Sequence, residues 1–200
     1  MGRPRRDAHT IATPERILRA AITEFGRVGY ESARLEDIAK RAGIQRPAVL
    51  YHYPSKKKLY AAVGQRIFEE LTQLMLTAFA AGGDIEERLT QVVKLLDDHF
   101  AKRPALARIF LREVASQGAT SQRAARDIAG PMLDVLEETL IREAGPRLRP
   151  GLPLRCALYH VWCNLLFFHA SGPMGQAIWK GNDSVTIARM LLLTDKPSKR

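Results

Sequence analysis

The sequence has little of what a catalytic or metal-binding protein requires. Two cysteines occur among 200 residues, seven positions apart, so it offers neither a disulfide framework nor a Cys-x-x-Cys metal pair. No Ser-His-Asp, Cys-His or paired-carboxylate arrangement stands at a telling spacing, and there is no glycine-rich phosphate loop. We therefore expect a protein that is not an enzyme, with no catalytic residues, no bound metal and no cofactor.

A long hydrophobic run is missing as well. The longest apolar segment, residues 154–170, is interrupted by Arg155, His160, Asn164 and His169, and is too broken for a confident bilayer span. The basic N-terminus is not followed by an apolar stretch, so no secretory signal is predicted. We expect a cytoplasmic protein with reduced thiols and no membrane partner.

Alternation typical of strands is absent, whereas apolar residues recur at three- and four-residue steps along the chain. With 46% hydrophobic residues, these segments can form a packed core. We expect an all-α fold of eight or nine helices, with caps at Thr13, Ser55 and Asp84. The expected segments lie near residues 13–25, 35–42, 46–53, 55–81, 84–100, 105–116, 128–140, 154–171 and 184–193.

Positive charge is concentrated in the first third of the chain. Residues 1–60 contain 13 Lys and Arg against 6 Asp and Glu, a net charge of +7, while the remaining residues contribute +3 to the total of +10. Such a basic segment on a nearly balanced remainder is typical of a nucleic-acid-binding domain.

Residues 35–56 predict two short helices joined by a tight turn. The first has an apolar stripe and ends at Gly43, where a left-handed residue can close a helix. Pro47 is tolerated in the first turn of the second helix, which Val49 and Tyr53 can anchor. The pattern indicates a helix-turn-helix whose second element faces DNA. The stripe consists of Leu35, Ile38, Ala39 and Ala42.

Several short motifs in residues 13–59 resemble the DNA-binding segment of TetR-type transcriptional regulators. The resemblance implies that one set of side chains faces bases and another holds phosphates. Arg34 replaces the usual hydroxyl residue before the second helix and can itself reach a phosphate, and Leu50 replaces a phosphate-contacting tyrosine. The motifs are Asp37-Ile38-Ala39, Ala42-Gly43-Ile44, Tyr51-His52-Tyr53 and Ser55-Lys56-x-x-Leu59. The implied base-facing residues are Arg46, Pro47 and Ala48; the phosphate-holding residues are Tyr51, His52 and Lys56; Gln45 and Arg34 complete the expected DNA-binding set.

The segment Leu154–Ser171 is apolar on nearly every side. A helix of this kind must be covered all round, and a second copy of the chain is an economical cover. We therefore expect a homodimer, in agreement with the four-helix interface of TetR-like proteins. The partner helix is either that of residues 132–140 or the terminal helix, and a central helix in a monomeric bundle is the alternative.

TetR-like regulators also enclose a small-molecule effector within their C-terminal helices. The candidates for binding an effector include one carboxylate, one thiol, one imidazole and several apolar side chains. Glu113 can instead pair with an arginine, and the aromatic residues can belong to the core. Cys156, His160 and Cys163 share one helix face, so a zinc or thiol site competes with simple core packing. The expected ligand-binding residues are Phe110, Glu113, Met132, His160, Cys163 and Phe167.

Together these patterns predict a transcriptional regulator of two parts. Residues 1–58 would form the helix-turn-helix DNA-binding domain with its basic arm, and residues 59–200 a larger helical domain for effector binding and dimerisation. We expect a ligand-responsive repressor that binds a palindromic double-stranded operator as a homodimer. A constitutive DNA-binding factor and a small helical metal-dependent enzyme are the competing hypotheses.

Overall fold

The computed structural model describes residues 12–80, 82–116, 122, 126, 130–179, 181 and 183–194, without the side chains of Phe79 and Met132. Within these residues the secondary structure is helical apart from one isolated antiparallel bridge between Leu148 and Leu193. The all-α expectation is confirmed. The chain divides into two compact units, residues 1–66 and 67–200.

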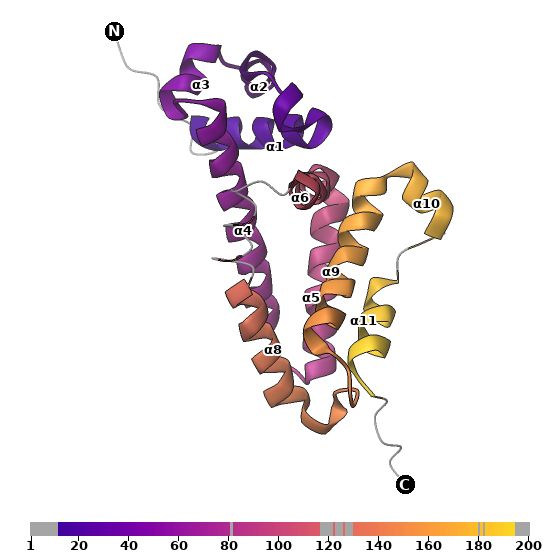
Figure 1. Ribbon diagram of the computed structural model, residues 1–200. Helices are drawn as coiled ribbons and strands as arrows, with labels where there is room; N and C mark the ends of the chain where they lie inside the picture. The colour runs from indigo at the N-terminus through magenta and orange to yellow at the C-terminus, as the bar shows by residue number, and fades with distance from the viewer. Residues whose placement is uncertain are drawn as a thin grey trace. The chain divides into compact units, whose positions relative to one another are not determined.

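The first unit contains three helices and the beginning of a fourth: α1 (Thr13–Ser32), α2 (Leu35–Ala42), α3 (Arg46–His52) and α4 (Lys56–Ala80) (Figure 1). Helix α2 packs against both α1 and α3. Apolar residues at helical spacing supply the core of this small unit. Its most deeply buried members are Ile17, Ala21, Phe25, Ile38, Val49, Leu59 and Val63.

The ends of the helices agree only partly with the predicted caps. The Ser55 hydroxyl accepts a hydrogen bond from the Lys58 amide at 3.1 Å, and Asp84 forms a capping box with Glu87, as expected. Thr13 was expected to cap α1, and this is wrong. Ala12 occupies that position without a side-chain bond, and the proline in the first turn starts the helix instead.

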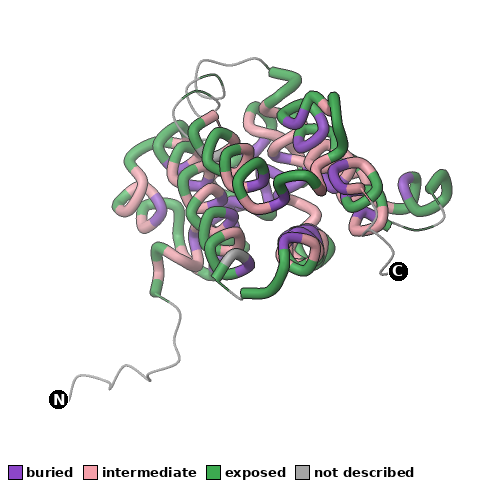
Figure 2. Tube along the Cα trace, turned by 90° about the horizontal axis from the view of Figure 1, so that it is seen from below, coloured by how far each residue is buried: buried purple, intermediate pink, exposed green. Residues whose placement is uncertain are grey.

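The second unit contains α5 (Ile85–Lys102), α6 (Pro104–Ser116), α8 (Gly130–Ala144), the 3-10 turn η2 (Gly145–Arg147), α9 (Leu154–Ser171), α10 (Pro173–Trp179) and α11 (Ser184–Leu192). Helix α9 is its centre and packs against α5, α6, α10 and α11 (Figure 1). Buried positions line the inner sides of these helices, and exposed positions line the outer sides (Figure 2). The predicted extension of α8 back to Ile128 falls outside the described residues.

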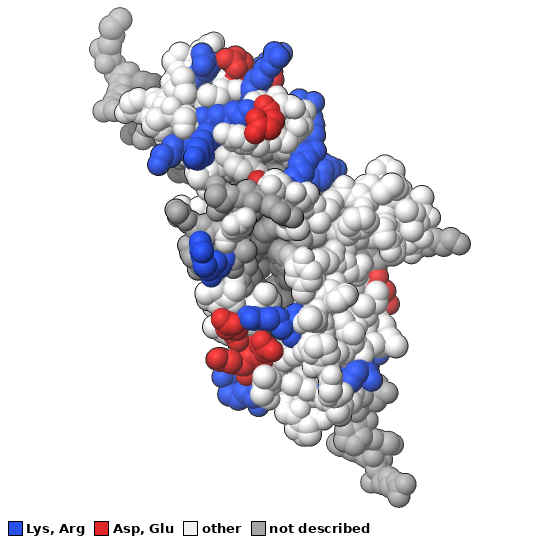
Figure 3. Space-filling view, in the orientation of Figure 1, with Lys and Arg blue, Asp and Glu red and all other residues white. Residues whose placement is uncertain are grey.

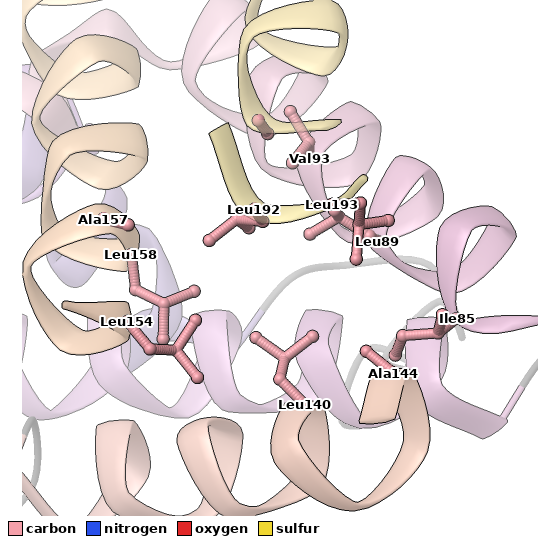
Figure 4. Close-up of a cluster of buried hydrophobic side chains, with 11 residues drawn as sticks. Ile85, Leu89, Val93, Leu140, Ala144, Leu154, Ala157, Leu158, Leu192 and Leu193 are labelled. Atoms are coloured by element: carbon pink, nitrogen blue, oxygen red, sulfur yellow. The ribbon is translucent and has the colours of Figure 1, made fainter. Parts of the chain in front are cut away.

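One apolar cluster joins four helices of this unit (Figure 4). It is built from aliphatic side chains of α5, α8, α9 and α11, so residues distant in sequence share one core. None of the described helices is both long enough and apolar enough to cross a bilayer. The cluster consists of Ile85, Leu89, Val93, Leu140, Ala144, Leu154, Ala157, Leu158, Ala188, Leu192 and Leu193.

Candidate nucleic-acid interface

The turn between α2 and α3 is fixed by a glycine and by an arginine from α1. Gly43 adopts φ 66° and ψ 37°, the left-handed conformation that a side chain disfavours. Its amide donates to the carbonyls of Ala39 and Lys40, which ends α2. The Arg16 guanidinium donates to the Ala42 carbonyl, and a Cβ at Gly43 would lie 2.9 Å from Arg16 Nη2. An arginine of α1 thus holds the end of α2 at the turn that precedes α3.

Helix α3 buries one side and leaves the other open. Val49 is fully buried, whereas Tyr51 is 84% exposed. Arg46 and Pro47 are also exposed, and Ala48 and His52 are partly so. Gln45 is the extended residue that precedes the helix. The structure thus brings six of the predicted DNA-binding residues together on or next to α3, anchored by one buried valine.

The other two predicted residues lie outside α3. Arg34 is the exposed residue that precedes α2, and its side chain does not cap the helix. Lys56 begins α4, where its ammonium donates to the Glu31 carbonyl at 2.9 Å and lies 4.7 Å from the centre of the Tyr30 ring. An ammonium has three donors, so this bond leaves others for a phosphate. Sequence reasoning missed the bond because no local pattern connects Lys56 to Glu31.

A buried carboxylate also went unnoticed in the sequence. The Glu24 side chain is enclosed in the first unit, where Arg27 Nη2 donates to Glu24 Oε1 at 2.6 Å and Arg41 Nη2 donates to Oε2 at 3.5 Å. Hydrogen bonding to Arg27, together with the charges of Arg27 and Arg41, outweighs burial and holds the pKa of Glu24 below its ordinary value of 4.5. This carboxylate therefore ties α2 to α1.

The lowered pKa predicts how the first unit responds to acid. A carboxylate whose pKa is lower in the folded state stabilises the fold above its unfolded pKa, and this contribution is lost as the pH falls through the folded pKa. We expect the free energy of opening of α1, measured by hydrogen exchange, to fall as the pH is lowered through and below the ordinary glutamate pKa of 4.5. Glu24→Gln should be less stable than wild type at the higher pH, and the difference should shrink in acid. A pH-independent difference would show that the carboxylate charge is not the cause.

The predicted ligand-binding residues do not gather on one face of the second unit. Phe110 of α6 packs edge-on against Trp162, with ring centres 5.5 Å apart. Helical geometry turns His160 and Phe167 away from the side of α9 that carries Trp162, and it places Cys163 about 100° around the helix from Trp162. Glu113 is half-buried on α6. The side chain of Met132 lies outside the described residues.

Two of these residues belong to the outer side of α9. His160 is exposed, and its Nδ1 lies 2.7 Å from the Cys156 carbonyl oxygen. Phe167 is 48% exposed and packs edge-on against Trp179 of α10. A hydrogen bond with Cys163 raises the pKa of Tyr159. Among the described residues, no three His, Cys, Asp or Glu side chains come together as a metal site.

The inner side of α9 packs against a group of aromatic rings, of which Phe110 is one of the predicted ligand-binding residues and Trp162 is not. Trp162 packs on both Phe100 and Phe110, with centres 5.5 Å apart in each case. His169 lies beside Phe100, and its Nε2 is 2.8 Å from an Asp97 carboxylate oxygen. Nearby, burial and the positive charge of Arg103 lower the pKa of His99. This part of the unit combines aromatic surface with titratable groups.

Helices α9, α10 and α11 also expose large apolar side chains. Figure 3 shows few charged side chains over these helices, whereas Lys and Arg gather on the first unit. Apolar exposure of this extent usually marks an interaction site. We call this surface the outer apolar face; its members are Tyr159, Phe167, Met174, Ile178, Trp179, Ile187 and Met190.

The first unit has the architecture of a helix-turn-helix DNA-binding domain, with α3 in the position of the recognition helix. Residues 17–63 match the sequence model of the bacterial regulatory proteins of the tetR family. The transcriptional repressor NicS of Pseudomonas putida is 27% identical over 135 residues, which cover 66% of this chain and 63% of NicS. This chain therefore matches less than two thirds of the length of that relative.

Two solved structures have the same fold. A TetR family transcription regulator from Marinobacter aquaeolei VT8 aligns with a TM-score of 0.72 at 18% identity, covering 92% of this chain and 96% of that one. The transcriptional regulator FadR from Bacillus subtilis, in complex with stearoyl-CoA, aligns with a TM-score of 0.65 at 16% identity, covering 88% and 94%. The helix-turn-helix region of the chain is thus similar to that of the tetR family, and the chain has the fold of these two solved regulators.

Proposed function

We propose that this protein is a transcriptional regulator, a ligand-responsive repressor that binds a palindromic operator as a homodimer. The observation that carries the proposal is α3, which is anchored by Val49 and presents Arg46, Pro47 and Tyr51 to solvent. A short helix of this kind fits the major groove of B-DNA. Residues 1–58 would read DNA, and residues 59–200 would provide dimerisation and effector binding.

The outer apolar face supports the homodimer. Tyr159 is 50% exposed and Ile178 is 61% exposed, values unusual for such side chains on a face with few charges. A two-fold axis places the same face of two copies in contact, so one apolar surface covers another. Two copies then present two recognition helices, and the preferred site becomes a near-palindrome with half-sites about 34–36 Å or a multiple apart.

The inner rings support the effector. Phe100, Phe110 and Trp162 offer apolar area, and His169 and His99 add polar groups in the same region, the combination typical of small-molecule sites. The relative FadR is described in complex with stearoyl-CoA, so a TetR-type fold can hold an acyl ligand. An effector that prefers a conformation incompatible with the operator shifts the population away from the DNA-bound form.

The DNA half of the proposal predicts separate roles for Arg46 and Lys57. Selection of bound duplexes from a random pool should yield a two-fold symmetric site. Arg46→Ala should then relax the preference at one base pair by about 1–3 kcal/mol, because a guanidinium can donate to both acceptors on the guanine edge. Lys57 is exposed and lies next to Lys56 at the start of α4. Lys57→Ala should weaken binding to the selected duplex and to random duplexes by similar factors. Equal losses on both kinds of DNA for Arg46→Ala would remove the base-reading role.

The same assay distinguishes a ligand-responsive repressor from a constitutive DNA-binding factor. The selected duplex is titrated in the presence of a metabolite library that includes acyl-CoA thioesters, and release is measured by fluorescence anisotropy. Ligand-responsive repression requires at least one compound that weakens DNA binding, with a coupling of about 1–3 kcal/mol. By linkage the same compound must bind the DNA complex more weakly by the same factor. Specific DNA binding that no compound changes would favour the constitutive factor.

A further inference from the structure

An acidic side chain stands beside the proposed base-reading arginine. Glu36, in the first turn of α2, places Oε1 3.0 Å from Nε of Arg46, the first residue of α3. The two side chains are 60% and 54% exposed, so the ion pair lies on the open side of the helix-turn-helix. It joins the two helices across the turn that Gly43 makes.

Stability does not account for this carboxylate. An ion pair between two half-exposed side chains contributes little to folding. A negative charge next to a recognition helix also repels phosphates and lowers the affinity for every DNA sequence. A favourable interaction with the α2 dipole is equally available to Asp37, which occupies the same first turn. The position of Glu36 therefore calls for a role that involves Arg46.

We propose that Glu36 is a positioning residue that determines the base specificity of Arg46, an inference that rests on the proposed function. The ion pair engages Nε, so the two terminal amino groups of the guanidinium remain for a base edge. Guanine offers O6 and N7 as a matching pair of acceptors in the major groove. A guanidinium that is already oriented loses less conformational freedom on binding. Its charge is also partly balanced, which weakens its pull toward phosphates on unrelated DNA.

The test compares Glu36→Gln with Asp37→Asn, which removes the same charge one residue along the exposed turn. Each full-length variant is titrated with the selected duplex, with the same duplex altered at the base pair that Arg46 reads, and with random DNA. For Glu36→Gln we expect discrimination at that base pair to fall by about fivefold or more, while affinity for random DNA is unchanged or higher. Asp37→Asn should raise affinity for all three duplexes by similar factors and keep the discrimination.

A double variant separates positioning from a general charge effect. If Glu36 acts through Arg46, adding Glu36→Gln to Arg46→Ala should cause no further loss of discrimination. Unchanged discrimination in Glu36→Gln overturns the inference, as does an equal loss in Asp37→Asn. If the wild type selects no DNA site at all, the proposed function itself has failed. If it selects one that depends on Arg46 but not on Glu36, only this inference has failed.

Discussion

Phe167→Asp is expected to convert the protein to a monomer and to weaken binding to the paired half-sites by about 100-fold or more. The substitution puts a carboxylate into the outer apolar face, where a two-fold contact would bury it twice without a partner. A monomer can still occupy one half-site, but it loses the gain of about 100- to 10,000-fold that linked binding provides. Analytical ultracentrifugation at micromolar concentration and titration of full and half operators measure the two effects.

The control for this prediction is Val114→Asp, a similar change at an exposed apolar position on α6. It should leave the dimer and the affinity intact. Leu165 and Trp162 also belong to the apolar segment Leu154–Ser171, but substitutions there would not test the interface. Leu165 is fully buried within the single chain, and Trp162 packs against both Phe100 and Phe110. A wild-type protein that sediments as a monomer would remove the homodimer from the proposal.

Phe25→Ala is expected to unfold the first unit and with it to abolish DNA binding. The ring is 1% exposed and packs edge-on against Tyr60, with centres 4.8 Å apart, and beside Tyr30 at 6.1 Å. Truncation of a buried phenylalanine costs about 3–5 kcal/mol. A unit of 66 residues has a small core and a correspondingly small margin of stability. Hydrogen exchange should show protection lost in α1–α3 and retained in α5, α9 and α11.

The matched control is Tyr51→Ala, which removes an aromatic ring from the exposed side of α3. Its effect on stability should stay within about 0.5 kcal/mol, because the ring contacts little of the core. Both variants are compared by thermal denaturation and by exchange at the same pH. Full protection of α1 in Phe25→Ala would contradict this prediction. It would mean that Tyr30 and Tyr60 move into the cavity left by the missing ring and keep the first unit folded.

The fold could be predicted where apolar spacing and capping residues agree. The α2–Gly43–α3 sequence contains a stripe, a left-handed position and a proline in the first turn, and each specifies the same structure. Helix α10 was not expected, because a segment of seven residues between Pro173 and Trp179 is too short to show a helical period. At the start of α1 the proline proved decisive and the threonine hydroxyl did not.

Predicting the sites is harder because their contacts are distant in sequence. The family motif predicts that α3 faces DNA. Neither the bond from Lys56 to Glu31 nor the burial of Glu24 has a local signal in the sequence. For the effector residues, helical spacing alone cannot say which side of α9 faces inward. The structure distinguishes the two sides of α9, since Trp162 packs against Phe110 on the inner side and Phe167 is exposed on the outer side.

The contact between Lys56 and the end of α1 has a consequence for the entropy of DNA binding. A free lysine side chain gives up as much as about 1.5–2 kcal/mol of rotamer freedom when it is immobilised. The ammonium of Lys56 is already held by the Glu31 carbonyl and the Tyr30 ring, so that cost is met when the protein folds. Lys57 and Lys58 are exposed and meet it only when a phosphate fixes them. If the protein binds an operator as proposed, these three consecutive lysines of equal charge would lose different amounts of side-chain conformational entropy on contact with phosphates.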